Sequence, residues 1–291
     1  MRVTEALISQ FVTQANTAAK KAVFHATQKV VSGKKLESPS EDLVSAQRIL
    51  HLDGILEELD HFDRARAIVQ ADFQAADNAA FAAINTMTSA LETAVQMAND
   101  TVNPDDRKAE AEAVQAMREH ILDLANTKLS DGRFLFSGLA EDTPPFDQNG
   151  VYQGADEKRT VEVMPGFKVE AQTLGKELFG DPSVIETLDT FVQALQTNDT
   201  ATISNMITQI DDAIHSMSLE HVSIGGRLKN VEESEVLLED LILRTQIKRA
   251  ESEDVDLASA ITELNTAELA MSSAIEAAKR LIGASALRWL S

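Results

Sequence analysis

"LDGILEELDHFDRARAIVQADFQAADNAAFAAINTMTSALETAVQM", residues 52–97, decides the fold. Apolar residues recur in it at alternating steps of three and four, the a/d pattern of one long helix packed lengthwise against another. The stripe consists of Leu52, Ile55, Leu59, Phe62, Arg66, Val69, Phe73, Ala76, Ala80, Ala83, Met87, Ala90, Ala94 and Met97. We predict stem packing through Leu59, Phe62, Val69, Phe73 and Met87. At about 1.5 Å per residue the helix is roughly 70 Å long, so we expect an elongated, rod-like protein rather than a globular one built around a pocket.

Capping signals mark where the first helices begin. The tetrapeptide SPSE at 38–41 reads as a capping box, with Ser38 as the N-cap and Pro39 at the first helical position. The run NDTVNPDD ends this helix, and Asn103, Pro104 and Asp106 within it cap a second one. The second helix is expected to reach about residue 129 and to fold back antiparallel on the first.

Two further helices are predicted in the second half of the chain. Asp181 and Pro182 cap the first of them, and TNDT at 197–200 separates it from a long helix. Gly225 and Gly226 lie inside that long helix, where each glycine costs about 1 kcal/mol relative to alanine. We interpret the pair as a kink or as a place where another backbone comes close. A phosphate-binding loop is disfavoured because no strand precedes the pair and no Lys-Ser/Thr follows it.

Both ends of the chain carry apolar stripes with helical spacing. We predict an assembly interface on them, formed by Val3, Leu7, Phe11, Leu257, Ile261, Leu264, Met271, Ile275, Ile282 and Trp289. Two such helices can pair with each other inside one chain, with copies of themselves, or with both. Periodicity alone leaves these alternatives open.

The middle of the chain differs in composition. Seven of the twelve glycines lie between residues 132 and 180, and short runs such as RFLF, GVYQ and RTVEVMP carry strand-type residues bounded by turn formers. We therefore predict a small β-rich insertion over 133–180, held at the tip of a helical stem. An insertion at a loop tip is expected to be removable, so deleting 140–178 should leave assembly intact.

Composition excludes several classes of protein. The net charge of −21 repels phosphate backbones and anionic lipid, so neither nucleic acid nor a membrane is expected as a partner. The absence of cysteine excludes disulfides, zinc–thiolate sites and thiol nucleophiles. The first residues lack an apolar core of signal-peptide length, so any export is expected to bypass the general secretory signal.

No motif that carries chemistry stands out. None of the six histidines forms an HxxxH or HExxH pair. A calcium loop starting at Asp100 would need glycine and glutamate where the chain has Asp105 and Ala111, so the segment is interpreted as a helix cap. We therefore predict no enzyme, no cofactor and no metal site. A cell-wall hydrolase with an acidic pair in a cleft stays as a lesser alternative.

Several segments together resemble the hook-associated protein 3 family, the hook–filament junction proteins of the flagellin superfamily. They are VVSGKKLESPSEDLVSAQRIL at 30–50, DGRFLFSGLAEDTPPF at 131–146, GVYQGADEKRTVEV at 150–163, SIGGRLKNVEES at 223–234 and the helix that ends in SALRWL at 285–290. The set GRFLFSG, TPPF and GVYQG is its specific part. Leu43 stands where the family usually has proline, and Gly226 where alanine is common.

The resemblance implies a mainly α fold: a long coiled-coil-like helical bundle rod built from both chain ends, with a small β-rich inserted domain. It implies terminal helices in an axial core (1–40 and 255–291), a helical stem (41–132 and 181–254) and an outer insertion (133–180). The implied function is a flagellar subunit that joins hook-associated protein 1 to flagellin in a helical ring of its own copies. An export chaperone and type III export to the extracellular flagellum are also implied. The terminal helices are expected to lack an adequate mate within one molecule and to order on assembly. A flagellin-like filament subunit and a non-flagellar coiled-coil scaffold remain the alternatives.

Overall fold

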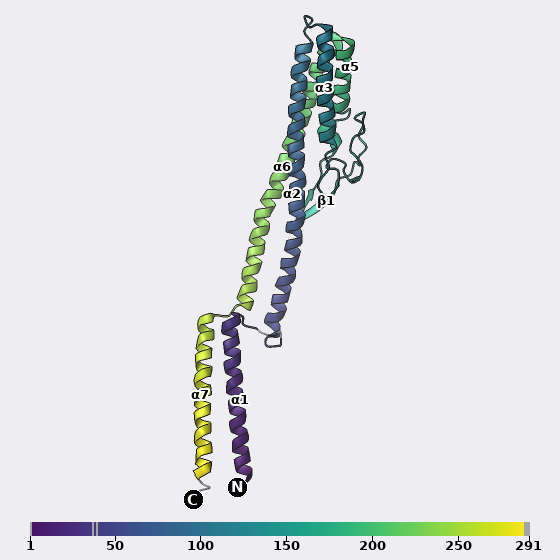
Figure 1. The fold of residues 1–291 in the computed structure, drawn as a ribbon. Coiled ribbons are helices and arrows are strands. Elements are labelled where there is room, and N and C mark those ends of the chain that lie inside the picture. The colour runs from purple at the N-terminus through teal and green to yellow at the C-terminus, as the bar shows by residue number, and fades with distance from the viewer. Residues whose placement is uncertain (1, 37, 39, 288–291) are drawn as a thin grey trace. The chain divides into compact units, whose positions relative to one another are not determined.

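A computed structural model describes residues 2–36, 38 and 40–287, and in that range the fold is mainly helical (Figure 1). The prediction of a mainly α fold is confirmed. In chain order the elements are α1 (Arg2–Ser32), α2 (Leu43–Met97), α3 (Pro104–Ala125), β1 (Thr160–Met164), β2 (Phe167–Glu170), α4 (Gly175–Phe179), α5 (Val184–Thr197), α6 (Thr200–Glu253) and α7 (Leu257–Leu287).

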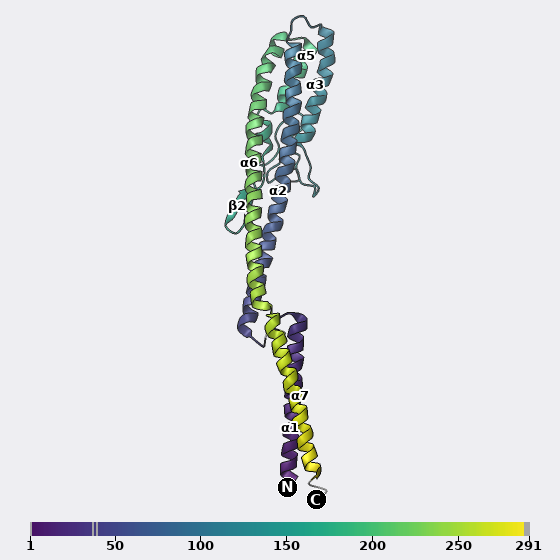
Figure 2. The same ribbon diagram turned by 90° about the vertical axis from the view of Figure 1, so that its left-hand side faces the viewer.

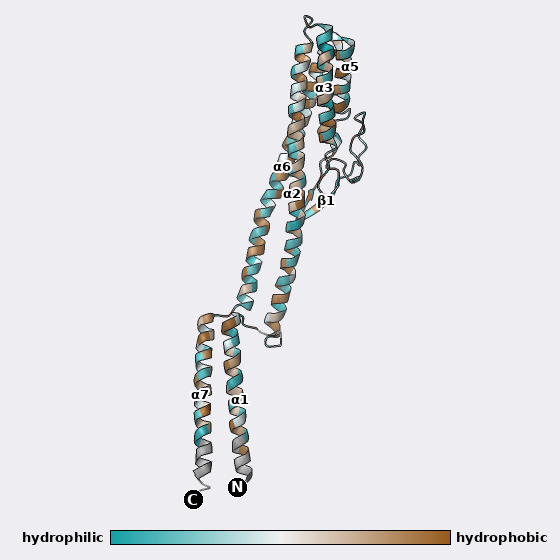
Figure 3. Ribbon diagram, viewed as in Figure 1, coloured by the Kyte–Doolittle hydropathy of each residue, from teal (hydrophilic) through white to brown (hydrophobic). Residues whose placement is uncertain are grey.

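The chain divides into two compact units. The terminal unit comprises residues 1–57 and 241–291, and the central unit comprises residues 58–240. Helices α2 and α6 contribute to both. In Figure 3 hydrophobic and hydrophilic residues alternate along these two helices, as expected where one face of a helix is buried.

The central unit has a continuous apolar core between α2, α3, α5 and α6. From Val69 onward every member of the predicted α2 stripe is buried, and its alanines are almost fully inaccessible to solvent. Apart from Met206, the buried apolar residues of α6 recur at steps of seven, the spacing of one position in a coiled-coil heptad. These residues are Ile203, Ile210, Met217, Ile224, Val231 and Leu238.

Arg66, the polar member of the stripe, is also buried, and it is paired. Its guanidinium lies 2.9 Å from the Asp63 carboxylate and 3.1 Å from that of Glu235 on α6. A buried charge is tolerated only when it is paired and hydrogen-bonded, and here the pairing ties α2 to α6. Of the five predicted stem residues, Leu59, Val69, Phe73 and Met87 are buried and Phe62 is half-buried.

Helix boundaries differ from the predicted ones at three places. Helix α2 begins at Leu43, and its cap is Asp42, whose carboxylate accepts the N–H groups of Val44 (3.0 Å) and Ser45 (3.2 Å). The hydrogen bonds from Ser45 hold the pKa of Asp42 below its usual value. Ser38 is therefore not the cap, and Pro39 lies outside the described residues.

The other two differences lie at the ends of α3 and α5. Asn103 caps α3 as predicted, but the helix ends at Ala125 rather than near 129. Helix α5 is capped by Ser183, whose hydroxyl accepts the N–H of Glu186 at 3.3 Å, and not by Asp181 or Pro182. In each case the cap is the polar side chain closest to the first orphan N–H groups of the helix.

Gly225 and Gly226 do not break α6, which is continuous from Thr200 to Glu253. A Cβ atom added at either position would meet nothing within 4 Å, so no described backbone approaches the pair closely. The expected close approach is therefore absent within the described part of the chain.

The segment between α3 and α5 contains less strand than predicted. Its one regular sheet is the antiparallel hairpin of β1 and β2, and RFLF and GVYQ contribute only isolated bridges. Leu135, Phe136, Ser137 and Gly138 are consecutive and all buried. A strand points neighbouring side chains to opposite faces, so four buried neighbours favour a turn that inserts into the core.

This segment is part of the central core and not a separable module. Phe136, Phe146 and Phe179 stack edge-to-face, with ring centroids 5.4 Å (Phe136–Phe179) and 5.7 Å (Phe146–Phe179) apart. They lie in the same buried cluster as Phe73 of α2 and Ile185 of α5. Deleting 140–178 would remove part of that core, so it is expected to destabilise the central unit, and its effect on assembly stays a prediction.

Candidate assembly surface

The two terminal helices pair with each other. Figures 1 and 2 show α1 and α7 side by side and antiparallel, so that the start of α1 and the end of α7 lie at the same end of the pair. Alanines form the buried seam: Ala26 on α1, with Ala260 and Ala278 on α7. The ammonium of Lys29 lies 3.2 Å from the Glu263 carboxylate across the seam. Small side chains bring the backbones close, but they bury little apolar area.

The connection after α1 explains the SGKK stretch. Gly33 has φ +70°, a left-handed conformation that favours glycine at a helix C-terminus. Its carbonyl accepts the N–H of Val255 at 2.9 Å, and the N–H of Lys35 donates to the Glu253 carbonyl at 2.7 Å. The Lys34 ammonium lies 2.6 Å from the Glu253 carboxylate. These contacts fasten the end of α1 to the junction of α6 and α7.

The predicted interface residues divide into two groups. Leu264, Met271 and Ile275 are half-buried. The exposed group comprises Leu7 (59%), Phe11 (70%), Leu257 (53%) and Ile261 (47%). The side chains of Val3 and Ile282 and the whole of Trp289 lie outside the described residues.

The terminal helices therefore do have a mate within one chain, contrary to the expectation. The predicted α7 stripe is buried only in part. Ala278 of that stripe is buried, Leu264, Met271 and Ile275 are half-buried, and Ala260 beside the stripe is buried too. Leu257 and Ile261 remain exposed on the flank of the pair.

Other exposed apolar residues of the terminal unit were not predicted. They are Phe24 and Val31 on α1, Leu269 on α7, Leu43, Val44 and Leu50 on α2, and Leu241, Leu243 and Ile247 on α6. An apolar residue outside the a/d stripe of a helix is the signal that could have identified them. An open groove of about 830 Å³ lies between α1 and α7 and is lined mainly by Ala, Ser and Thr side chains.

Charge is divided sharply between the two units. The terminal unit carries 13 Lys and Arg and 13 Asp and Glu, whereas the central unit carries 13 and 34. The whole net charge of −21 therefore belongs to the central unit. Like charges repel across a protein surface, so the neutral terminal unit is the part that can pack densely against copies of itself.

The described residues offer little for chemistry. Among them no group of three or more His, Asp or Glu side chains could hold a metal ion. Over the same part of the chain, no helix combines the length and apolarity that crossing a bilayer requires. The terminal unit offers exposed apolar side chains on a surface with no net charge, which suits association.

Comparisons with known proteins agree with this picture. Residues 5–141 match the family of the bacterial flagellin N-terminal helical region. The chain is 22% identical over 261 residues to the flagellar hook-associated protein 3 of Salmonella typhimurium, covering 81% of this chain and 82% of the relative. It is 22% identical over 276 residues to the protein of the same name from Escherichia coli, covering 86% and 87%.

Solved structures show the same fold. A putative flagellar hook-associated protein from Vibrio parahaemolyticus superposes with a TM-score of 0.69 at 19% identity, over 74% of this chain and all of that one. Flagellar hook-associated protein 3 from Legionella pneumophila superposes with a TM-score of 0.64 at 16% identity, over 70% of this chain and 98% of that one.

Proposed function

We propose that the chain is a member of the flagellin superfamily and a structural subunit of the bacterial flagellum at the hook–filament junction. It joins the zone of hook-associated protein 1 to the flagellin filament by helical assembly. Its relatives are structural flagellar proteins, so its work is to hold neighbours together rather than to catalyse a reaction.

One observation carries the proposal: the neutral terminal unit leaves large apolar side chains exposed beside a seam made of alanine. Phe11 is 70% exposed and Leu7 59%. Each large apolar side chain gains about 1.5–3 kcal/mol when it is fully buried, so several of them supply a substantial driving force for association. Where exposed apolar side chains gather on a protein surface, they commonly mark a site that binds a partner.

In this proposal the parts of the chain have separate roles. The terminal helices, residues 1–40 and 255–291, form the axial core, with Val3, Leu7, Phe11, Leu257 and Ile261 among the contact residues, together with Leu264, Met271, Ile275, Ile282 and Trp289. Residues 41–132 and 181–254 form the stem, and 133–180 faces outward. The acidic central units, which repel one another, lie outside the neutral cores.

The partners are those that the resemblance to the hook-associated protein 3 family implies. An open array needs heterologous interfaces, in which one face of a subunit meets a different face of the next. Copies of the chain, hook-associated protein 1 and flagellin are the neighbours in such an array. An export chaperone covers the apolar terminal surface before assembly, and the flagellar type III apparatus carries the chain to the cell exterior.

Disrupting the gene tests the role. Cells should build hooks without filaments and shed flagellin into the medium, as seen by electron microscopy and by immunoblotting of the supernatant. The wild-type gene should restore filaments. A gene with Phe11→Asp and Ile261→Asp should not, because two carboxylates then enter an interface that must be desolvated.

A matched control and the alternatives complete the design. Phe167→Asp changes an exposed phenylalanine in the β1–β2 hairpin and should restore filaments. Normal filaments after disruption would favour a non-flagellar scaffold. Filaments that persist but lose a minor component would favour a flagellin-like subunit. If the gene with both substitutions restored filaments, the exposed apolar residues of the terminal helices would not be needed for assembly.

A further inference from the structure

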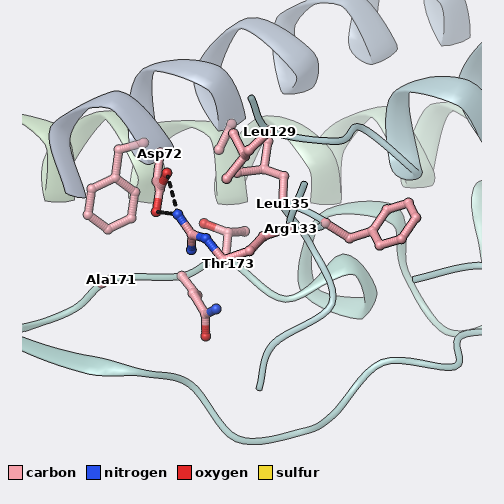
Figure 4. A pocket seen from close by; sticks show the side chains of 10 residues that line it. Asp72, Leu129, Arg133, Leu135, Ala171 and Thr173 are labelled. Atoms are coloured by element: carbon pink, nitrogen blue, oxygen red, sulfur yellow. Dashed lines mark hydrogen bonds and ion pairs between the residues drawn. The ribbon is translucent and has the colours of Figure 1, made fainter. Parts of the chain in front are cut away.

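A small cavity lies where the insertion meets α2. Its walls are formed by Asp72, Phe73 and Ala76 of α2, by residues 129 and 133–135, and by residues 171–173 (Figure 4). The centre of a water molecule could occupy about 10 Å³ of it, enough for one water. The site lies entirely within the central unit.

The walls contain a buried hydroxyl group without a partner. Thr173 is only 2% exposed, and its Oγ1 has no hydrogen-bond partner among the protein groups. A buried hydroxyl group is costly when it is left unpaired, so native proteins pair nearly all of them with protein or with ordered water.

The side-chain amide of the neighbouring Gln172 is engaged by other groups, and it is not a partner of the Thr173 hydroxyl group. The Gln172 Nε2 donates to the Gly138 carbonyl at 3.0 Å and to Glu141 at 3.1 Å, and its Oε1 accepts the N–H of Arg159 at 2.9 Å.

The Asp72 carboxylate, in contrast, has spare capacity. Its oxygens lie 3.4 and 3.5 Å from Nη2 of Arg133 and 3.3 Å from Nη2 of Arg159, as the dashed lines to Arg133 in Figure 4 show. Charge-assisted bonds of this kind are usually about 2.7–2.9 Å long. A carboxylate has about four acceptor sites, so these long contacts leave room for a further donor. Burial raises the pKa of Asp72, although the nearby Arg133 acts in the opposite direction. The raised pKa agrees with a carboxylate whose charge is incompletely solvated.

We propose that this cavity is a binding site for one ordered water molecule, which links the Thr173 hydroxyl group to the Asp72 carboxylate. The water supplies the missing partner of Thr173 and the missing donor to Asp72. It thereby joins the insertion to α2 beside the two arginine contacts. Polar cavities of this size hold water, whereas empty cavities are apolar.

Two measurements on the full-length chain test the proposal together. The first is a high-resolution crystal structure, in which one water should lie within hydrogen-bond distance of Thr173 Oγ1 and of Asp72. The second is the melting temperature of Thr173→Val, which has nearly the same volume but no hydroxyl group. With the water present, the variant should melt about 2–4 °C lower, because it loses the bridge.

The direction of the change in melting temperature distinguishes a cavity that holds water from a dry one. If the cavity were dry, valine would remove an unpaired hydroxyl group, and the melting temperature would stay the same or rise. Thr173→Ser is the matched control, since it keeps the hydroxyl group and should keep the water in its crystal structure. A dry cavity in the wild-type crystal, or a Thr173→Val variant that melts no lower than wild type, would overturn the proposal.

Discussion

Phe146→Ala should lower the free energy of unfolding of the central unit by about 3–5 kcal/mol, the range observed for deleting a buried aromatic ring. Phe146 is 2% exposed, and its ring contacts those of Phe179 (5.7 Å) and Tyr152 (5.4 Å) edge-to-face. Each such aromatic pair adds about 0.5–1.5 kcal/mol beyond its buried area, so the upper half of the range is expected.

The structure also indicates that the site cannot collapse to fill the gap. The side chain of Asn126 holds the main chain of Phe146 in place through bonds of 3.0 and 2.9 Å to its carbonyl and its N–H. Alanine at this position therefore leaves a cavity rather than a rearranged loop, and the cost rises with the cavity volume.

Urea unfolding of the full-length chain measures the effect. The chain has one tyrosine, Tyr152 in the central unit, and one tryptophan, Trp289. Tyrosine emission therefore follows the central unit, and circular dichroism follows all helices. Phe167→Ala is the control, because that ring is 36% exposed in the β1–β2 hairpin and its loss should cost less than about 1 kcal/mol. If both variants lose equally little, residues 133–180 do not share the core of the stem.

Three further substitutions probe buried polar groups of the central unit. Arg107→Ala removes a guanidinium that donates to two main-chain carbonyls and one side-chain amide oxygen, and should cost about 2–4 kcal/mol in thermal unfolding, whereas exposed Lys108→Ala should stay within about 0.5 kcal/mol. Tyr152→Phe removes a hydroxyl group that lies 3.2 and 3.1 Å from two carbonyl oxygens, an expected loss of about 1–2 kcal/mol. Burial raises the pKa of Tyr152 to about 12, so the stability it provides should be present below pH 10 and lost toward pH 12; ionisation near 10 in the folded chain would contradict this. Burial likewise raises the pKa of Asp72 above 3.8, so its contribution is present below that pH and lost as the pH rises through the raised pKa. The melting temperature of Asp72→Asn relative to wild type should therefore climb across that window and then level off, and a difference that is flat with pH would refute the assignment.

Local sequence patterns predicted the long helices and the resemblance to the family. Heptad spacing places Val69, Phe73 and Met87 on one face of a helix whatever that face meets, because a helix repeats every 3.6 residues. The capping residue Asn103 was identified for the same reason, since a cap acts within one turn. The cap of α2 was missed because Ser38 and Asp42 are both competent caps, and only the observed start at Leu43 decides between them.

The sequence by itself thus determined which segments are helical, which face of each is apolar and which superfamily the chain resembles. Only the tertiary structure decided that α1 and α7 pair with each other through alanine, that Phe146 joins the core of the stem, and that Asp72 meets Arg133 and Arg159 at a polar cavity. The physical reason is the distance along the sequence between the residues that interact. Helix formation depends on neighbours within a turn, whereas these contacts join residues tens to hundreds of positions apart, and their energies come from burial and desolvation that no local pattern encodes.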